Sequence, residues 1–240
     1  MKAQERHHLK TNEFAERMAW VTEQATTNRS RILTIAAAIV VLAAIAGGYF
    51  YFQSRAKDSA SAMMGSALAI QQSPITPAPA VAGVTQAPGT YPTAAARGEA
   101  AAAAFQKVAA AYTSGDTGAA ARYYLGTAYL DLGKGAEAEK AFAEAATMGS
   151  GSLYGDMAQL GRGQALAAQA KYDDAVKTLA ELSGRRDTAV PIDGVLMELA
   201  RVCRKAGKVA EAKAAFKRVA DEFPQSGYAG EAKQQLATMG

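Results

Sequence analysis

The sequence has few of the side chains on which most enzymes and metal sites depend. Its 240 residues include one cysteine and two histidines, His7 and His8, which are adjacent near the N-terminus. A single cysteine excludes an intramolecular disulfide and a cysteine-rich zinc site. Without an imidazole in the rest of the chain, most histidine-dependent catalysis and most transition-metal sites are excluded too. We therefore predict a protein that is not an enzyme and that uses no cofactor, metal or small-molecule substrate.

Aromatic residues are also scarce, at 8%, and neither sign of charge dominates. The 26 Lys and Arg residues are interspersed with 22 Asp and Glu residues, so the net charge of +4 does not indicate a nucleic-acid partner. Alanine, in contrast, occupies 58 positions. It loses no side-chain entropy in a helix, whereas a β-sandwich needs β-branched and aromatic residues. The composition predicts an all-α fold.

Five segments of different composition follow one another along the chain. They are a polar tail (1–31), an apolar segment (32–52), an alanine-rich helix (53–72), a proline-rich insert (73–93) and a succession of helices with glycine-containing turns (94–240). Phe14, Met18 and Val21 recur at helical spacing beside Trp20, which predicts a short amphipathic helix in the tail. His7 and His8 are expected to be solvated. The insert is interpreted as a spacer, with a polyproline ligand as the alternative.

The apolar segment 32–52 carries no charged residue, and as a helix it would be about 31 Å long, close to the hydrocarbon thickness of a bilayer. One alternative is a cleaved signal peptide, but the preceding tail is long and the apolar run exceeds the usual length of about 7–15 residues. The other is a buried helix of a soluble domain, which would carry more polar residues than Thr34 alone. We therefore predict a single transmembrane helix.

The charges beside this helix predict its orientation. Six Lys and Arg residues lie in the tail, and a long domain follows the span, which favours a cytoplasmic N-terminus and an external C-terminal domain. The segment Tyr49 to Phe52 would then form an aromatic belt at the outer interface. The reverse orientation is the alternative.

A repeat with a period of 37 residues organises the rest of the chain. Ala138, Ala175 and Ala212 are separated by 37 residues, and a large apolar residue follows each of them four positions later. Small residues recur before them, where two helices must pack closely or where a helix must end. The residues expected in the repeat core are Leu125, Gly126, Tyr129, Ala138, Phe142, Gly163, Ala175, Leu179, Ala200, Ala212, Phe216 and Pro224, and those expected at the turns are Gly133, Ala170 and Gly207.

The period predicts an α-solenoid of about three to four helix pairs. The complete units would span about 119–152, 156–189 and 193–226, followed by a capping helix at 225–239 with a polar outer face. One period before Ala138 stands Ala101, with Phe105 after it. The segment Arg97 to Tyr112 is therefore interpreted as a second helix whose partner would be supplied by 59–72.

The motif Leu125-Gly126-x-x-Tyr129, followed by Ala138-x-x-x-Phe142, resembles the tetratricopeptide repeat (TPR), whose usual period is 34. Together with the tail and single span, it resembles the ancillary SecYEG translocon subunit family of the bacterial inner membrane. That resemblance implies a periplasmic domain, contact with SecYEG and with a periplasmic chaperone, and transfer of exported chains. The alternative is a general envelope TPR adaptor in division or envelope assembly. The cell-division coordinator family shares the Phe223 to Ser226 element but is normally soluble.

The TPR resemblance also implies which residues face a partner. The partner-binding groove would be lined by Tyr123, Thr127, Asp131, Met157, Leu160, Gln164, Met197, Arg201, Arg204 and Lys205. Arg201, Arg204, Lys205 and Lys208 share one helical face. The groove would thus be apolar in the middle and basic at one end, where it could hold a carboxylate. The alternative is that these four cations form an ordinary solvated face. Cys203 is expected in the core.

Overall fold

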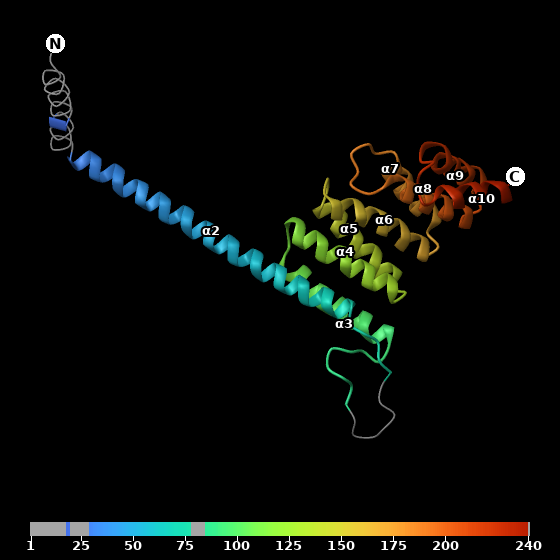
Figure 1. Ribbon diagram of the computed structural model, residues 1–240, viewed down its shortest axis with the longest axis horizontal. Helices are drawn as coiled ribbons and strands as arrows, with labels where there is room; N and C mark the ends of the chain where they lie inside the picture. Colours follow the sequence, from blue (N-terminus) through green and yellow to red (C-terminus); the bar gives the residue numbers. More distant parts are fainter. Residues whose placement is uncertain (1–17, 20–28, 78–84, 240) are drawn as a thin grey trace, which may run out of the picture. The chain divides into compact units, whose positions relative to one another are not determined.

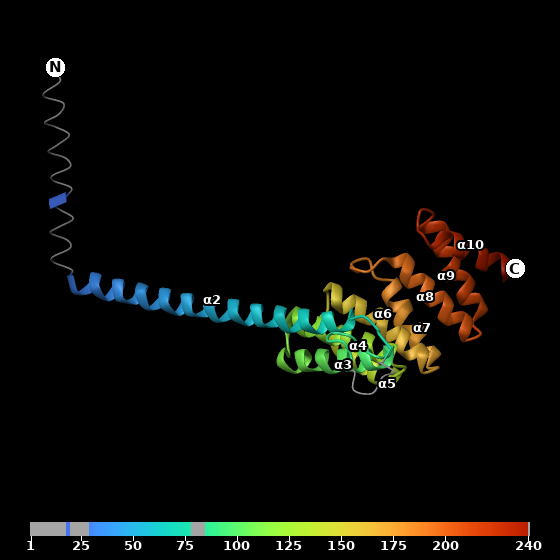
Figure 2. The same ribbon diagram turned by 60° about the horizontal axis from the view of Figure 1, so that its bottom comes forward.

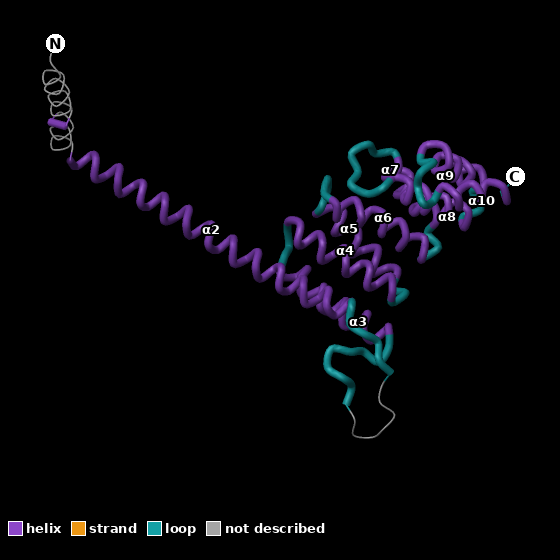
Figure 3. Tube along the Cα trace, in the orientation of Figure 1, coloured by secondary structure: helices purple, strands orange, loops and turns teal. Residues whose placement is uncertain are grey.

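The computed structural model describes residues 18–19, 29–77 and 85–239, and these are helical apart from turns, linkers and one isolated bridge between Ile75 and Tyr91 (Figure 1 and Figure 3). The chain divides into two compact units, Met1–Asp58 and Ser59–Gly240. Of the predicted amphipathic helix in the tail, Met18 is helical. Its other predicted members, and His7 and His8, lie outside the described residues.

Helix α2 (Arg29–Gln71) begins in the first unit and ends in the second. Its stretch Arg29–Tyr51 is long and apolar enough to cross a membrane, and none of its most apolar window is buried. Ile39, Leu42 and Ile45 are among the large side chains that it exposes. Just after this apolar stretch, the guanidinium carbon of Arg55 lies 5.2 Å from the centroid of the Tyr51 ring.

The second unit is a stack of helices joined by short connections (Figure 1 and Figure 2). After α2 come α3 (Ala94–Ala111), α4 (Gly115–Asp131), α5 (Gly135–Met148), α6 (Leu153–Ala168), α7 (Tyr172–Ser183), α8 (Ile192–Lys205), α9 (Val209–Glu222) and α10 (Ala229–Thr238). From α3 onward each helix packs on the next, and α6 also contacts α4 and α8. Contacts of this kind between equivalent helices of neighbouring pairs define an α-solenoid, which confirms the predicted fold class.

Residues 59–71 of α2 form the helix that packs on α3. Ala67 is fully buried in one cluster with Ala101 and Phe105, and Met64 and Leu68 pack against that cluster. The proline-rich insert between these helices is closed at its base. The Thr76 N–H donates to the Tyr91 carbonyl (2.9 Å), and the Tyr91 N–H donates to that of Pro74 (3.0 Å). The described ends of the insert are therefore held together.

The repeat core depends on small residues facing large ones. The repeated alanines and the large residues four positions after them are all buried: Ala101, Ala138, Ala175 and Ala212, with Phe105, Phe142, Leu179 and Phe216. The Phe142 ring fits between α4 and α6, where a Cβ atom on Gly126 would lie 2.8 Å from it and one on Gly161 2.5 Å. A Cβ atom on Gly163 would lie 2.6 Å from Leu179. Glycine is required at these positions because any side chain would push the helices apart.

Three equivalent turns join the two helices of each complete pair. Their central residues, Gly133, Ala170 and Gly207, all adopt a left-handed backbone, with φ of 71°, 60° and 74°. In each turn the N–H of the following lysine donates to a carbonyl five residues before it: Lys134 to Tyr129, Lys171 to Leu166 and Lys208 to Cys203, at 2.8, 3.0 and 2.9 Å. This pattern satisfies carbonyl groups that the end of a helix would otherwise leave without partners.

Helix α10 covers the C-terminal end of the stack. Pro224 stands just after α9, where it cannot continue the helix. Ala229 and Ala232 of α10 are buried, whereas Lys233 and Gln234 are exposed to solvent. A terminal helix with one apolar face and one polar face is what a solenoid needs at its end.

Candidate partner-binding groove

A groove with a volume of about 590 Å³ is lined by α4, α6, the linker between α7 and α8, the start of α8 and Tyr228. Six of the ten residues predicted to face a partner line it: Tyr123, Thr127, Asp131, Met157, Leu160 and Gln164. They come from the first helices of two neighbouring pairs, which lie side by side because α4 contacts α6.

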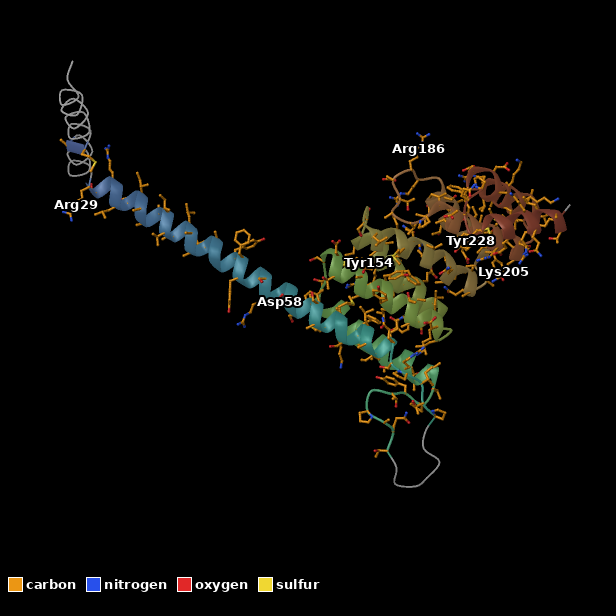
Figure 4. The ribbon with its side chains drawn as sticks, viewed as in Figure 1. Arg29, Asp58, Tyr154, Arg186, Lys205 and Tyr228 are labelled. Atoms are coloured by element: carbon orange, nitrogen blue, oxygen red, sulfur yellow. The ribbon has the colours of Figure 1, made fainter. Side chains whose placement is uncertain are left out.

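The floor and rim of the groove are largely apolar. The centroid of the Tyr123 ring lies 5.8 Å from that of Phe142 and 6.0 Å from that of Tyr154, which is labelled in Figure 4. Burial raises the pKa of the Tyr123 hydroxyl above its ordinary value. At the rim, Leu153 is 49% exposed and Tyr228 41%. The groove therefore offers apolar surface together with a few hydrogen-bonding groups.

The charge of the groove differs from the prediction. Its charged lining residues are Asp131 and Asp193, and no Lys or Arg is among the lining residues that the structure describes. Among the residues that the structure describes, no three His, Cys, Asp or Glu side chains lie close enough together to hold a metal ion. The prediction of a basic end is corrected by this lining, because the groove carries negative charge.

The four cations predicted at that end lie elsewhere. Arg201 donates to both carboxylate oxygens of Glu231 on α10, each at 2.9 Å, and Arg204 donates to Gln235 on the same helix. Lys208 pairs with Asp173 of α7 at 2.7 Å, and this hydrogen bond raises the lysine pKa. Lys205 is exposed on α8 (Figure 4). Two of these cations therefore attach the terminal helix, and none lines the groove.

Met197 is also misplaced by the prediction. Its side chain is only 1% exposed and belongs to the hydrophobic cluster of α8 and α9, against which the groove residue Leu160 packs. It therefore supports the groove from within the core and cannot contact a partner. Cys203 lies in the same cluster, and desolvation raises its pKa to about 11, with a smaller contribution from Glu211.

The linker between α7 and α8 is the part of the groove that the pattern of helix positions did not reveal. It contributes Ala189, Val190 and Pro191 to the lining. Asp156, at 2% exposure, holds this linker: it accepts a hydrogen bond from Arg185 at 2.5 Å and one from the Ala189 N–H at 2.7 Å. Arg186 in the same linker projects away from the helices (Figure 4).

Asp193 stands one period of 37 after Asp156 and has a related role. It accepts a hydrogen bond from the Ser226 hydroxyl at 2.5 Å, which attaches the turn between α9 and α10. Tyr228, which follows in that turn, lies two periods after Tyr154. The repeat register could therefore have identified these residues, because each occupies a position equivalent to one in an earlier unit.

The stacked helix pairs and the groove define the class: a helical-repeat protein of the kind that typically serves as a non-enzymatic scaffold for other proteins. The tetratricopeptide repeat family profile matches residues 94–152 and 158–227, slightly more than half of the chain. The chain therefore belongs to the tetratricopeptide repeat family, and a role in protein interaction follows from that fold.

Two crystal structures of a putative kinesin light chain with nearly identical TPR-like repeats, from Podospora anserina, are similar to part of this chain. One is a point variant of the other. Each shares 17% sequence identity, with a TM-score of 0.52, and the alignment covers 60% of this chain and 77% of that one. At this identity the similarity concerns the fold alone. Among curated proteins, no sequence matches this chain.

Proposed function

We propose that this protein is a membrane-anchored scaffold that binds protein partners in the groove between α4, α6 and the α7–α8 linker. The observation that carries the proposal is the groove itself, a concave apolar surface with exposed Leu153 and Tyr228 at its rim. Exposed apolar surface of this kind is commonly buried by a binding partner. The groove's volume of about 590 Å³ suits a short segment of another chain.

The anchor of the scaffold would be the apolar part of α2. The stretch Arg29–Tyr51 has the length and composition of a membrane span, and its apolar side chains are exposed. Exposed Tyr49, Phe50 and Tyr51 near its end suit the interface between lipid and water. With the N-terminus in the cytoplasm, the repeats would lie in the periplasm of a Gram-negative bacterium.

The specific role that we propose is that of an ancillary subunit of the SecYEG translocon, linking exported chains to a periplasmic chaperone. Support comes from the order of the segments: a charged tail, one apolar helix, an alanine-rich helix and TPR units, which resembles that family. The general envelope adaptor, acting in division or envelope assembly, is the competing role, and the partners captured in cells distinguish the two.

Site-specific photo-crosslinking in living cells tests the role. Probes replace Tyr123, Leu153 and Tyr228 in the groove, and a control probe replaces Lys177, which is exposed on α7. We expect the groove probes to capture translocon subunits or periplasmic chaperones. Division or envelope-assembly proteins in their place would support the competing adaptor, and equal capture at Lys177 would contradict binding in the groove.

Protease accessibility tests the orientation independently. Protease added to spheroplasts should digest the C-terminal repeats and leave a fragment that contains the tail and the apolar part of α2. If the repeats are protected until the membrane is dissolved, the domain is cytoplasmic and the translocon role is rejected.

A further inference from the structure

We propose that the groove selects partner segments in which aliphatic or aromatic side chains stand beside a lysine or arginine. This inference rests on the proposed function of the groove as a partner site, and it adds the chemistry of the segment that is recognised. It is the reverse of the preference for a carboxylate that the sequence pattern suggested.

Both charged residues that line the groove, Asp131 and Asp193, are acidic. Asp131 is exposed at the last position of α4, where the helix dipole adds negative potential. Among the described residues it forms no ion pair. Its carboxylate is thus accessible to a cation on a bound segment, and a Lys or Arg side chain could reach it with a charge-assisted hydrogen bond.

Asp193 adds a second carboxylate from the start of α8. The Ser226 hydroxyl and the Gly194 N–H bind its two oxygens, at 2.5 and 2.9 Å, which fixes the orientation of the group. Helix α6 contacts both α4 and α8, so the two carboxylates come from helices that neighbour the central helix of the groove. A segment lying across α6 would meet negative charge from both.

An acidic segment would find no compensating charge. The described lining contains no Lys or Arg, because Arg201, Arg204 and Lys208 bind Glu231, Gln235 and Asp173 instead. A carboxylate that enters a largely apolar groove loses hydration, and without a partner this loss is unfavourable. Discrimination therefore arises both from attraction to a cation and from rejection of an anion.

The apolar lining selects the rest of the segment. Met157 is unbranched and adapts to side chains of different shape, while Leu153 and Tyr228 are partly exposed at the rim. Burial of these surfaces by a partner would supply most of the affinity, and the carboxylates would supply the preference between partners.

Binding of labelled peptides to the full-length chain in detergent micelles tests the inference, with fluorescence anisotropy as the readout. Four peptides of equal length share one host sequence. The first carries Leu, Phe and two Lys residues, the second replaces Lys by Glu, the third replaces Lys by Gln, and the fourth replaces Leu and Phe by Ser. We expect the first peptide to bind most tightly, the third more weakly, and the second and fourth weakest.

Variants assign the preference to the groove. Asp131→Asn should reduce the affinity for the lysine peptide, relative to that for the glutamine peptide, about two- to fivefold, as expected for one exposed ion pair. Asp174→Asn is the matched control, because Asp174 is exposed in the first turn of α7 and does not line the groove. Higher ionic strength should reduce the difference between the lysine and glutamine peptides.

Equal or tighter binding of the glutamate peptide would overturn the inference, and so would an Asp131→Asn variant that keeps the full lysine preference. Absence of binding by all four peptides would overturn it as well. The crosslinking experiment in cells tests the proposed function independently of the charge preference. If groove probes capture partners while the peptides show no preference for lysine, only the charge selection fails.

Discussion

Ala170 occupies a turn position at which the other two repeats have glycine. All three residues adopt a left-handed backbone. For a residue with a Cβ atom this conformation costs about 1–2 kcal/mol. The second unit therefore keeps the turn geometry at the expense of local stability, because the hydrogen bond from Lys171 to Leu166 and the packing of α6 on α7 require it.

Replacing this alanine should stabilise the fold. We expect Ala170→Gly to raise the free energy of unfolding by about 1 kcal/mol, as strain is released and partly offset by greater freedom of the unfolded chain. The same substitution at Ala214, exposed in the middle of α9, should lower it by about 1 kcal/mol because glycine is a poor helix former. Urea denaturation of the full-length chain in micelles measures both. A loss of stability in both variants would contradict the strain at Ala170.

Cys203 offers a second local test. Burial raises its pKa to about 11, so near neutral pH the thiol is protonated as well as enclosed. We expect a disulfide reagent such as Ellman's to modify the native protein far more slowly than the urea-unfolded chain, because the thiolate is the reactive form. The native rate should rise as the pH approaches 11. Rapid modification of the native protein near neutral pH would show that the thiol is accessible.

Among the elements, the linkers that lead into α8 and α10 depend on acidic residues one period apart. Asp156 holds the first linker and Asp193 the second, each from the first turn of a helix. A long linker is entropically costly to order. Because the α7–α8 linker forms one wall of the groove, Asp156 positions that wall, although it does not itself line the groove.

Substitution of Asp156 should therefore loosen one wall of the groove. In Asp156→Asn, the amide NH2 faces one of the two donors, and we expect a loss of about 2 kcal/mol in the free energy of unfolding. Amide hydrogen exchange at Ala189 and Val190 should become faster. Asp187→Asn is the control: Asp187 bonds to the same arginine but is exposed, and its removal should leave both readouts nearly unchanged. Unchanged exchange in Asp156→Asn would contradict this role.

For the molecule as a whole, the property to test is the proposed attachment to a membrane. We expect the full-length chain to stay in the membrane pellet after alkaline carbonate extraction. A lysine in place of Val40, in the middle of the apolar stretch, should impair insertion, since the cost at the centre of a span is about 2.5–3.5 kcal/mol. Val209→Lys, an exposed site in α9, is the matched control and should leave extraction unchanged. Release of the unaltered chain by carbonate would contradict the anchor.

The residues named from the sequence agree with the lining of the observed groove where that lining comes from regular helix positions. Tyr123, Met157 and Leu160 were placed there by the resemblance to the TPR pattern, and all three line the observed groove. The prediction was wrong for Met197 and Arg201, because their surroundings depend on which neighbour covers α8. It omitted Pro191, because a linker has no periodic pattern that predicts its path.

The amino-acid sequence was sufficient for the helical class, the period and most of the buried repeat positions, whereas Pro224, which was expected in the repeat core, is exposed. All of these depend on local propensity and on spacing along one chain, which can be read without knowledge of distant contacts. The charge of the groove was decided only in the tertiary structure. There, α10 binds Arg201 and Arg204 of α8, and α7 binds Lys208 of the turn that follows α8. Asp131 and Asp193 remain at the groove, because ion pairing between elements is set by which surfaces meet.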